Sequence, residues 1–173
     1  MQSLAFWKAV VADKANFLES LIGLLEERGI RYCAIGGVAV NAYSRPVVTE
    51  DLDLVIALDQ LEAVEALLQE RFHVRRFPYT LNVSTADSDL RVQIQTSTDF
   101  EGFVQRASRR PVMGLTLPVA SLEDVLQSKI WAAMEPRRRA SKRQKDLADI
   151  SRLLEDYPHL RDRVPQEILD RLI

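Results

Sequence analysis

The sequence predicts an α/β fold: a small mixed β-sheet flanked by helices, followed by a helical C-terminal part. Short apolar runs of strand length alternate with stretches whose apolar residues recur at helical spacing. At 173 residues, the chain is long enough to bury about two-thirds of the surface that it exposes when unfolded. We expect a single domain over residues 1–173, with the sheet in residues 1–120 and the helices of residues 121–173 packed on it.

The first elements expected are a helix, a strand and a short helix. Residues 3–28 carry apolar side chains at helical spacing, and Gly29 is placed to stop this helix. The apolar run at residues 32–35 predicts the first strand. Residues 38–43 predict a short helix, which Pro46 ends because proline cannot continue a helix.

The middle of the chain adds the remaining strands. Residues 51–57 predict a second strand, and residues 61–72 predict a helix with one apolar face. Residues 81–83 and 90–94 predict a hairpin, because a polar turn joins two short apolar runs.

Towards the C-terminus the pattern becomes helical. Residues 100–107 predict a short helix, and residues 112–119 predict one or two short strands. Two long helices follow at residues 122–134 and 141–156, with a last short helix at residues 166–172.

The glycine pair Gly36-Gly37 and the acidic pair Asp51 and Asp53 are the most informative residues. The glycines lie where a strand gives way to a helix, where backbone N–H groups can approach a phosphate closely. The two aspartates stand two apart in a predicted strand and therefore project from the same face. Paired carboxylates suit Mg²⁺ (or Mn²⁺), which substrate phosphates then help to hold. A plain turn or a solvated strand end would explain either pair alone, but together they indicate nucleotide chemistry.

This pattern resembles the minimal nucleotidyltransferase superfamily, the polymerase-β-like fold. Its signature is a hydrophobic residue, Gly-Gly or Gly-Ser, a spacer and then Asp-x-Asp. Arg45 and Thr49, ahead of Asp51, resemble the Arg-x-x-x-Thr-x-Asp-x-Asp variant of bacterial abortive-infection and toxin-type nucleotidyltransferases. Residues 121–134 and 143–154 are similar to the downstream part of that group, where a helix lysine and a helix aspartate accompany the metal site.

The resemblance implies a nucleotidyltransferase-like fold and a Mg²⁺-dependent reaction. A nucleoside monophosphate would move from an NTP to a hydroxyl of RNA, protein or a small molecule, and a cognate toxin or antitoxin would be a partner. The residues that the resemblance assigns fall into three groups: catalytic Asp51, Asp53, Lys129 and Asp146; nucleotide-binding Gly36, Gly37, Arg45, Thr49 and Lys129; and metal-binding Asp51, Asp53 and Gln93.

Gln93 stands where the resembling enzymes have a third acid on a neighbouring strand. Its amide oxygen can contact a metal, but it carries no charge and accepts no proton as a base. Three explanations stay open. The first is an enzyme that works with two carboxylates and another base, such as Asp87, Asp89 or Asp99. The second is a non-catalytic nucleotide-binding, antitoxin or partner-binding module. The third is that the true third acid lies one or two residues away, in another register of the strand.

Two helical charges fall on apolar faces. Lys129 lies inside the apolar arc of its helix, and Asp146 lies within the apolar face of the next one. Because a buried charge is costly without a partner, Lys129 either pairs with an acid such as Asp146 or reaches the nucleotide phosphates with Asp146 orienting it. Six basic side chains in residues 137–145 form either a solvated helix end or a patch that attracts phosphate.

The overall composition points to the cytoplasm. A net charge of −2 gives no general attraction to nucleic acid. Cys33 is the only cysteine, so no intrachain disulfide can form and a reducing compartment fits. We see neither a signal peptide nor an apolar run long enough to span a membrane.

Overall fold

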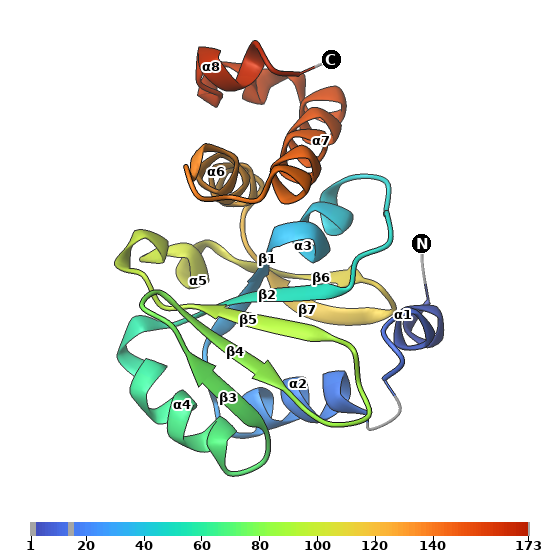
Figure 1. The fold of residues 1–173 in the computed structure, drawn as a ribbon, viewed down its shortest axis with the longest axis vertical. Coiled ribbons are helices and arrows are strands. Elements are labelled where there is room, and N and C mark those ends of the chain that lie inside the picture. Colours follow the sequence, from blue (N-terminus) through green and yellow to red (C-terminus); the bar gives the residue numbers. More distant parts are fainter. Residues whose placement is uncertain (1–2, 14–15, 173) are drawn as a thin grey trace.

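A mixed β-sheet forms the centre of the computed structural model, which describes residues 3–13 and 16–172 (Figure 1). The strands are β1 (Tyr32–Ile35), β2 (Asp51–Ile56), β3 (His73–Arg76), β4 (Thr80–Ser84), β5 (Arg91–Gln95), β6 (Ser108–Val112) and β7 (Leu115–Val119). Their order across the sheet is β3-β4-β5-β2-β1-β7-β6. The pairs β2–β5 and β1–β7 are parallel and the other neighbours are antiparallel, so the predicted mixed α/β sheet is confirmed.

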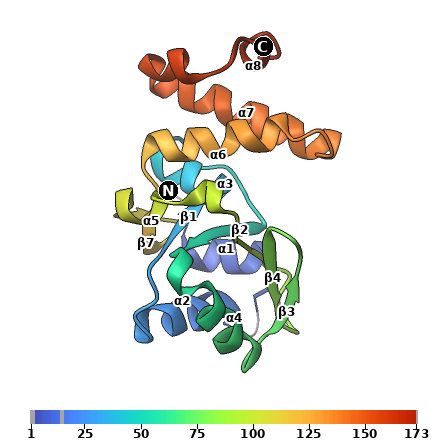
Figure 2. The same ribbon diagram turned by 90° about the vertical axis from the view of Figure 1, so that its left-hand side faces the viewer.

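Helices cover both sides of this sheet. They are α1 (Leu4–Val10), α2 (Phe17–Glu27), α3 (Gly36–Tyr43), α4 (Leu61–Gln69), α5 (Phe103–Arg106), α6 (Leu122–Met134), α7 (Ala140–Asp156) and α8 (Gln166–Leu169). Short 3₁₀ turns occupy Leu58–Gln60, Thr98–Phe100 and Pro158–Arg163. Helices α2 and α4 lie on one side, whereas α3, α6, α7 and α8 are stacked on the other (Figure 2). The helical C-terminal part is therefore present as expected. No helix within the described ranges has the length and apolar character needed to cross a membrane.

The predicted single helix over residues 3–28 is wrong for the described residues, because α1 and α2 are separate helices. Asn16, just before α2, has a left-handed φ of 53°. The buried Asp13 carboxylate accepts hydrogen bonds from the N–H groups of Phe17 (2.8 Å) and of the residue after it (3.1 Å). A side-chain acceptor for the free N–H groups at a helix start favours this break. Residues 14–15 lie outside the described residues.

The other elements differ from the prediction mainly at their ends. Strand β1 and helix α6 have the predicted bounds, and β4 and β5 form the predicted antiparallel hairpin. Residues 112–119 contain the end of β6 and all of β7. Strand β3 was not predicted, because this edge strand contains a single apolar residue, Val74. The helix expected at residues 61–72 ends early at Gln69, and the one expected at residues 100–107 shortens to the four residues of α5.

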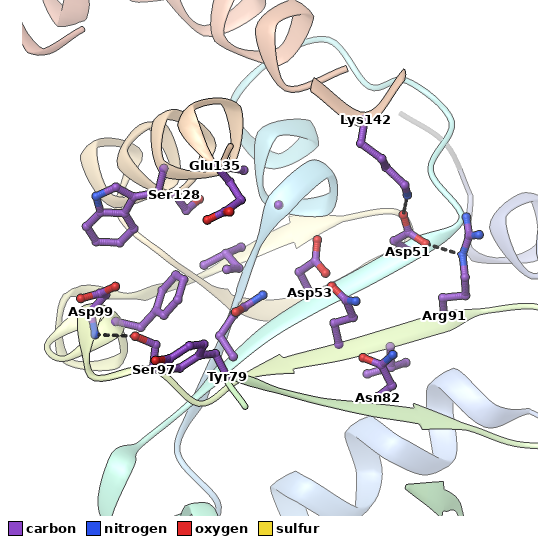
Figure 3. Close-up of a pocket in the computed structure, with 18 of the residues that line it drawn as sticks. Asp51, Asp53, Tyr79, Asn82, Arg91, Ser97, Asp99, Ser128, Glu135 and Lys142 are labelled. Carbon is purple, nitrogen blue, oxygen red and sulfur yellow. Dashed lines mark hydrogen bonds and ion pairs between the residues drawn. The ribbon is translucent and has the colours of Figure 1, made fainter. Parts of the chain in front are cut away.

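Strand β2 lies near the centre of the sheet and determines which side carries polar groups. Leu52 and Leu54 are fully buried in the core. The aspartates that alternate with them, Asp51 and Asp53, are only partly buried and point to the opposite face, towards α6 and α7 (Figure 3). This alternation is the period-two pattern of a strand with one face in the core, and it places both carboxylates on the same side.

Candidate active site

A cavity of about 1070 Å³ lies between the sheet and the C-terminal helices (Figure 3). Strands β2, β4 and β5 form its floor, and α6 with the first turns of α7 forms its roof. Among the predicted site residues, those that line it are Gly36, Asp51, Asp53, Gln93, Lys129 and Asp146. Segments far apart in the sequence therefore meet around one space that is large enough for a small-molecule ligand.

Gln93 lies directly beside Asp53 across the parallel pair β2–β5. Asn82 of β4 lies on the other side of Gln93, so these three polar side chains form a row across the cavity floor. The buried Oδ1 atom of Asn82 has no hydrogen-bond partner among the described residues. The position expected to carry a third acid is therefore a glutamine in register with Asp53. The next side chain across the sheet, Asn82, is also a neutral amide.

The acids considered as replacements for the third carboxylate lie in different places. Asp99 lines the cavity. Asp87 and Asp89 belong to the exposed turn between β4 and β5 and do not line it.

Gly36 begins α3 at the edge of the cavity, with a left-handed φ of 69°. A Cβ atom added here would lie 3.0 Å from Cγ and 3.1 Å from Cβ of Asp53. Only glycine leaves room for the carboxylate of Asp53 at the positively polarised N-terminus of this helix. The residue before it, Ile35, has no polar side chain, so no N-cap side chain occupies the free N–H groups of the first turn.

The other residues expected at the nucleotide lie beside the cavity and do not line it. Gly37 packs near Thr49, whose Oγ1 would lie 3.4 Å from an added Cβ atom. The Thr49 hydroxyl accepts a hydrogen bond from the N–H of Asp51 (3.3 Å), so it shapes the chain entering β2. The Arg45 side chain is exposed, and its carbonyl accepts a hydrogen bond from the Arg152 guanidinium (2.5 Å).

Two cations hold the Asp51 carboxylate. The Arg91 Nε donates to Oδ1 at 2.7 Å, and Lys142 Nζ lies 3.2 Å from Oδ2 (Figure 3). Although partial burial tends to raise the pKa of Asp51, Lys142 and Arg91 together hold it below its ordinary value. Arg91 was not expected at the site, whereas Lys142 belongs to the basic segment of residues 137–145 that the sequence offered as a possible phosphate patch. The alternation that turns Gln93 to the cavity also turns Arg91 there, which is the signal that could have identified it.

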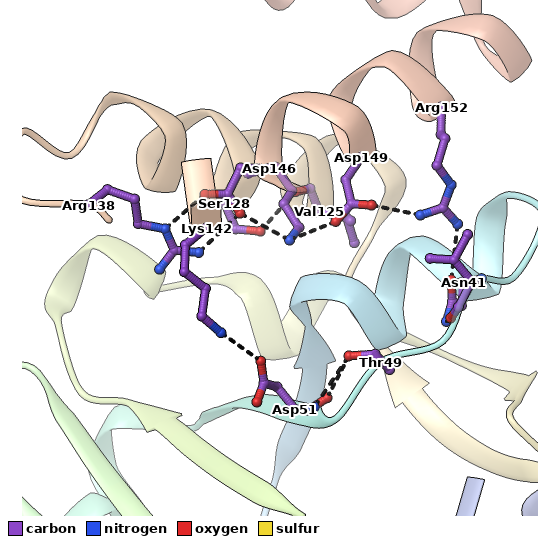
Figure 4. A network of polar contacts seen from close by, with 12 residues as sticks. Asn41, Thr49, Asp51, Val125, Ser128, Arg138, Lys142, Asp146, Asp149 and Arg152 are labelled. Atoms are coloured by element: carbon purple, nitrogen blue, oxygen red, sulfur yellow. Dashed lines mark hydrogen bonds and ion pairs between the residues drawn. The ribbon is translucent and has the colours of Figure 1, made fainter. Parts of the chain in front are cut away.

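Lys129 of α6 pairs with two acids of α7 in a largely buried chain of charges; Figure 4 shows these acids, Asp146 and Asp149. The Lys129 Nζ is 3.3 Å from Asp146 Oδ1 and 2.9 Å from Asp149 Oδ2. Arg138 donates to both oxygens of Asp146, at 2.9 and 3.1 Å, and Asp146 is only 1% exposed. Arg152 in turn pairs with Asp149 at 2.6 Å. Pairing with Asp146, one of the two alternatives considered for Lys129, is present, and Asp149 is a further partner that the sequence did not identify.

The charges around Asp53 perturb its protonation. Burial raises the pKa of Asp53 to about 6, the nearby Lys129 ammonium opposes this rise, and the neighbouring Asp51 carboxylate adds to it. For Lys129 itself, burial lowers the pKa, but Asp149 and Asp146 outweigh it, so that the pKa is raised. Lys129 is therefore a permanent positive charge on the cavity wall.

The basic segment at residues 137–145 divides into two groups. Arg138 and Lys142 contact the acids described above, and Arg143 donates to carbonyl oxygens at the end of α6, those of Ala133 (3.0 Å) and Glu135 (2.7 Å). The other three basic side chains are exposed: Arg137, Arg139 and Lys145. Three of the six basic side chains thus contact groups of the site or of the fold, and the other three lie on the solvated surface at the start of α7.

Comparison with known proteins places this geometry in a family. A family model described as "Nucleotidyl transferase AbiEii toxin, Type IV TA system" matches residues 35–172. No curated protein sequence matches the chain.

Several solved structures share the fold. The chain is similar to the antibiotic-resistance factor ANT(2'')-Ia, with 13% identity and a TM-score of 0.58 over 89% of this chain and 93% of that one. It is similar to the lincosamide antibiotic adenylyltransferase LnuA, with 14% identity and a TM-score of 0.54 over 83% and 99% of the two chains. A nucleotidyltransferase-like protein from Paracoccidioides brasiliensis gives 21% identity and a TM-score of 0.56 over 89% and 78%. At these identities the similarity establishes the fold.

The family match spans most of the chain and includes the Gly-Gly pair, the Asp-x-Asp pair, Lys129 and Asp146. The chain belongs to the AbiEii family of nucleotidyltransferase toxins of type IV toxin–antitoxin systems.

Proposed function

We propose that this chain is a cytoplasmic, Mg²⁺-dependent (or Mn²⁺-dependent) nucleotidyltransferase that moves a nucleoside monophosphate from an NTP to a hydroxyl. The observation that supports this proposal best is the meeting of Asp51 and Asp53 with the free N-terminus of α3 in one large cavity. Hard oxygen ligands and unoccupied backbone N–H groups are the two features that a metal-bound triphosphate needs.

The oxygen atoms at the floor of the cavity fit a divalent cation. The carboxylates of Asp51 and Asp53 and the amide of Gln93 line it together. Within residues 3–13 and 16–172, no group of three acids, histidines or cysteines is placed to hold a metal. Two carboxylates with a neutral oxygen are nonetheless a common Mg²⁺ set when phosphates supply the other ligands. A divalent cation held by Asp51, Asp53 and Gln93 would supply positive charge to stabilise the charge that develops on the α-phosphate and the leaving pyrophosphate.

The chain's own residues bind and orient the nucleotide. The N–H groups of Gly36 and Gly37, at the positive end of α3, would donate hydrogen bonds to the oxygens of the triphosphate. Lys129 supplies a further positive charge at the cavity wall. Asp146 and Asp149 hold its ammonium group in place, so that it needs little reorganisation when the phosphates arrive.

The acceptor and the partner also belong to this proposal. The volume of about 1070 Å³ slightly exceeds the usual range for a small-ligand pocket, which leaves space for part of an acceptor beside the nucleotide. The candidate acceptors are hydroxyls of RNA, of a protein or of a small molecule. We further propose a cognate antitoxin as the partner, on the basis of the family. Because both the sheet and the C-terminal helices line the cavity, we propose that residues 1–173 act as one domain.

The test combines binding with transfer. Isothermal titration of the four NTPs with Mg²⁺ is performed on the wild type and on Asp51→Ala and Asp53→Ala, with the exposed acid variant Asp162→Ala as the matched control. A second assay offers labelled NTPs with tRNA, total protein and small hydroxyl compounds. We expect both cavity variants to lose Mg²⁺-dependent binding and label transfer, and the control to keep them.

Three outcomes distinguish the interpretations. Equal Mg²⁺-dependent binding by the wild type and both cavity variants would contradict the metal assignment. Nucleotide binding without transfer to any acceptor would favour the non-catalytic module that Gln93 suggests. Transfer that depends on Asp51 supports the proposed enzyme and identifies the class of its acceptor.

A further inference from the structure

We propose that Lys142 is an exchangeable counter-ion, which holds the Asp51 carboxylate in the nucleotide-free protein and contacts the nucleotide phosphates once a divalent cation takes Asp51. This inference rests on the metal and nucleotide sites of the proposed function. It adds a nucleotide-binding residue and a competition between a protein cation and the metal for the same carboxylate.

Lys142 connects the roof of the cavity to its floor. It lies in the first turn of α7, and its ammonium group reaches down to Asp51 at the start of β2 (Figure 4). The Nζ–Oδ2 distance is 3.2 Å, and the two side chains are 29% and 30% exposed. This contact joins residues 91 positions apart. Because both groups remain accessible to water, the contact can open without breaking the core.

Both oxygens of Asp51 already have a cation. Arg91 is bound at Oδ1 and Lys142 at Oδ2, so a metal that uses this carboxylate meets two positive charges. Like charges a few ångströms apart repel, and the repulsion is stronger in a partly dehydrated cavity than in bulk water. Binding of a divalent cation to Asp51 therefore requires at least one of the two side chains to move.

Lys142 is the cation that can leave at the lowest cost. Arg91 makes the shorter contact, at 2.7 Å, and also pairs with Glu50 at 3.2 Å, which keeps it at the sheet. Lys142 contacts no other acid within salt-bridge distance among the described residues. Its flexible stem and compact ammonium group suit a change of partner, and lysine is a common ligand of phosphate.

The other cavity cations that contact acids are held more tightly. Lys129 and Arg138 both pair with Asp146, which is almost fully buried. Moving either one would leave a buried carboxylate with less compensation, which is strongly unfavourable. Moving Lys142 instead exposes Asp51 to the incoming divalent cation, which replaces the lost positive charge. The exchange thus keeps every acid of the site neutralised.

The proposal predicts effects of opposite sign in a single variant. Lys142→Met removes the competitor for Asp51, so the affinity for Mn²⁺ alone should rise about fivefold, the size expected for release of one partly exposed ion pair. The same variant lacks the ammonium group that is proposed to contact the nucleotide phosphates. Its affinity for the nucleotide at saturating Mn²⁺ should therefore fall about tenfold, as expected for loss of one charge-assisted hydrogen bond.

The experiment uses the full chain and two ligands. Mn²⁺ binding is followed by electron paramagnetic resonance of the free ion. Nucleotide binding is followed by calorimetry with the four α,β-methylene nucleoside triphosphates, which cannot transfer their nucleotide. Lys145→Met is the matched control, because Lys145 lies on the same helix, is exposed and contacts no acid among the described residues. Lys142→Gln provides a second variant of different polarity, and thermal unfolding checks that each variant is folded.

The outcomes separate this inference from the proposed function. An unchanged or lower Mn²⁺ affinity in both Lys142 variants, or an unchanged nucleotide affinity, shows that Lys142 is only a structural clamp and overturns the inference. Equal shifts in the Lys145 variant show a general charge effect and overturn it as well. Asp51→Ala tests the proposed metal site separately. If Mn²⁺ binding survives this substitution, the assignment of the metal to Asp51 is wrong.

Discussion

Replacing Gly36 by alanine tests the closest contact in the site. Gly36 has a left-handed φ of 69°, which costs an alanine about 1–2 kcal/mol. The reduced freedom of the unfolded chain returns about 0.4–1 kcal/mol, so the backbone effect alone destabilises the fold by about 1 kcal/mol. The new Cβ atom would also press on Asp53, at 3.0 Å from its Cγ and 3.1 Å from its Cβ. Overpacking of this kind costs about 1–3 kcal/mol, which gives a total of about 2–4 kcal/mol.

Two other glycines separate these contributions. Gly29 has a similar φ of 65°, but nothing lies within 4 Å of an added Cβ atom, so Gly29→Ala should cost only the backbone contribution of about 1 kcal/mol. Gly23 lies inside α2 with equally open surroundings, and Gly23→Ala should stabilise the protein by about 0.5–1 kcal/mol.

The free energy of unfolding of each variant is measured by urea denaturation at constant pH, without metal. In the Asp53→Ala background the extra cost of Gly36→Ala should fall, because the carboxylate that it presses on is gone, but it should stay above that of Gly29→Ala, because the Cβ atom 3.1 Å away remains. Equal destabilisation by Gly36→Ala and Gly29→Ala in the wild-type background would refute the close approach of Asp53 to Gly36.

Three further predictions concern charge and fluorescence. The pKa of Asp53 is raised from 3.8 to about 6, so the folded state favours the protonated carboxyl. The resulting contribution to the free energy of unfolding is fully present below about pH 4 and is lost as the pH rises through 6. In urea denaturation without metal, Asp53→Asn should match the wild type at pH 4 and exceed it by up to about 3 kcal/mol at pH 7.5; a difference that does not grow with pH contradicts the shift. Lys129→Met leaves the buried carboxylates of Asp146 and Asp149 with less positive charge to balance them, and should lower the free energy of unfolding by about 3 kcal/mol. A loss below about 1 kcal/mol in the same assay would argue against this charge network. Trp131 lines the cavity and is 39% exposed, so binding of an α,β-methylene NTP should change the tryptophan fluorescence, and Trp131→Phe should abolish that change.

The sequence by itself determined the local features of the fold. Strand β1 and helix α6 follow from their own apolar patterns, and both have the predicted bounds. The period-two pattern of β2 was sufficient to place Asp51 and Asp53 on one face, because that orientation depends only on the strand's own geometry. The patterns did not predict β3, because an edge strand is stabilised by pairing with β4 and needs few apolar residues of its own.

Apart from the pair of Lys129 with Asp146, which the sequence suggested, tertiary structure decided which polar and charged groups meet. The register that sets Gln93 beside Asp53 arises from parallel pairing of strands that are separated by a helix and a hairpin. The contact of Lys142 with Asp51 joins a helix and a strand 91 positions apart, and no periodicity within either element specifies it. A pattern reports which face of an element a side chain occupies. The packing of elements decides which opposite charge that face then meets, since the interaction of charges depends on their distance in space.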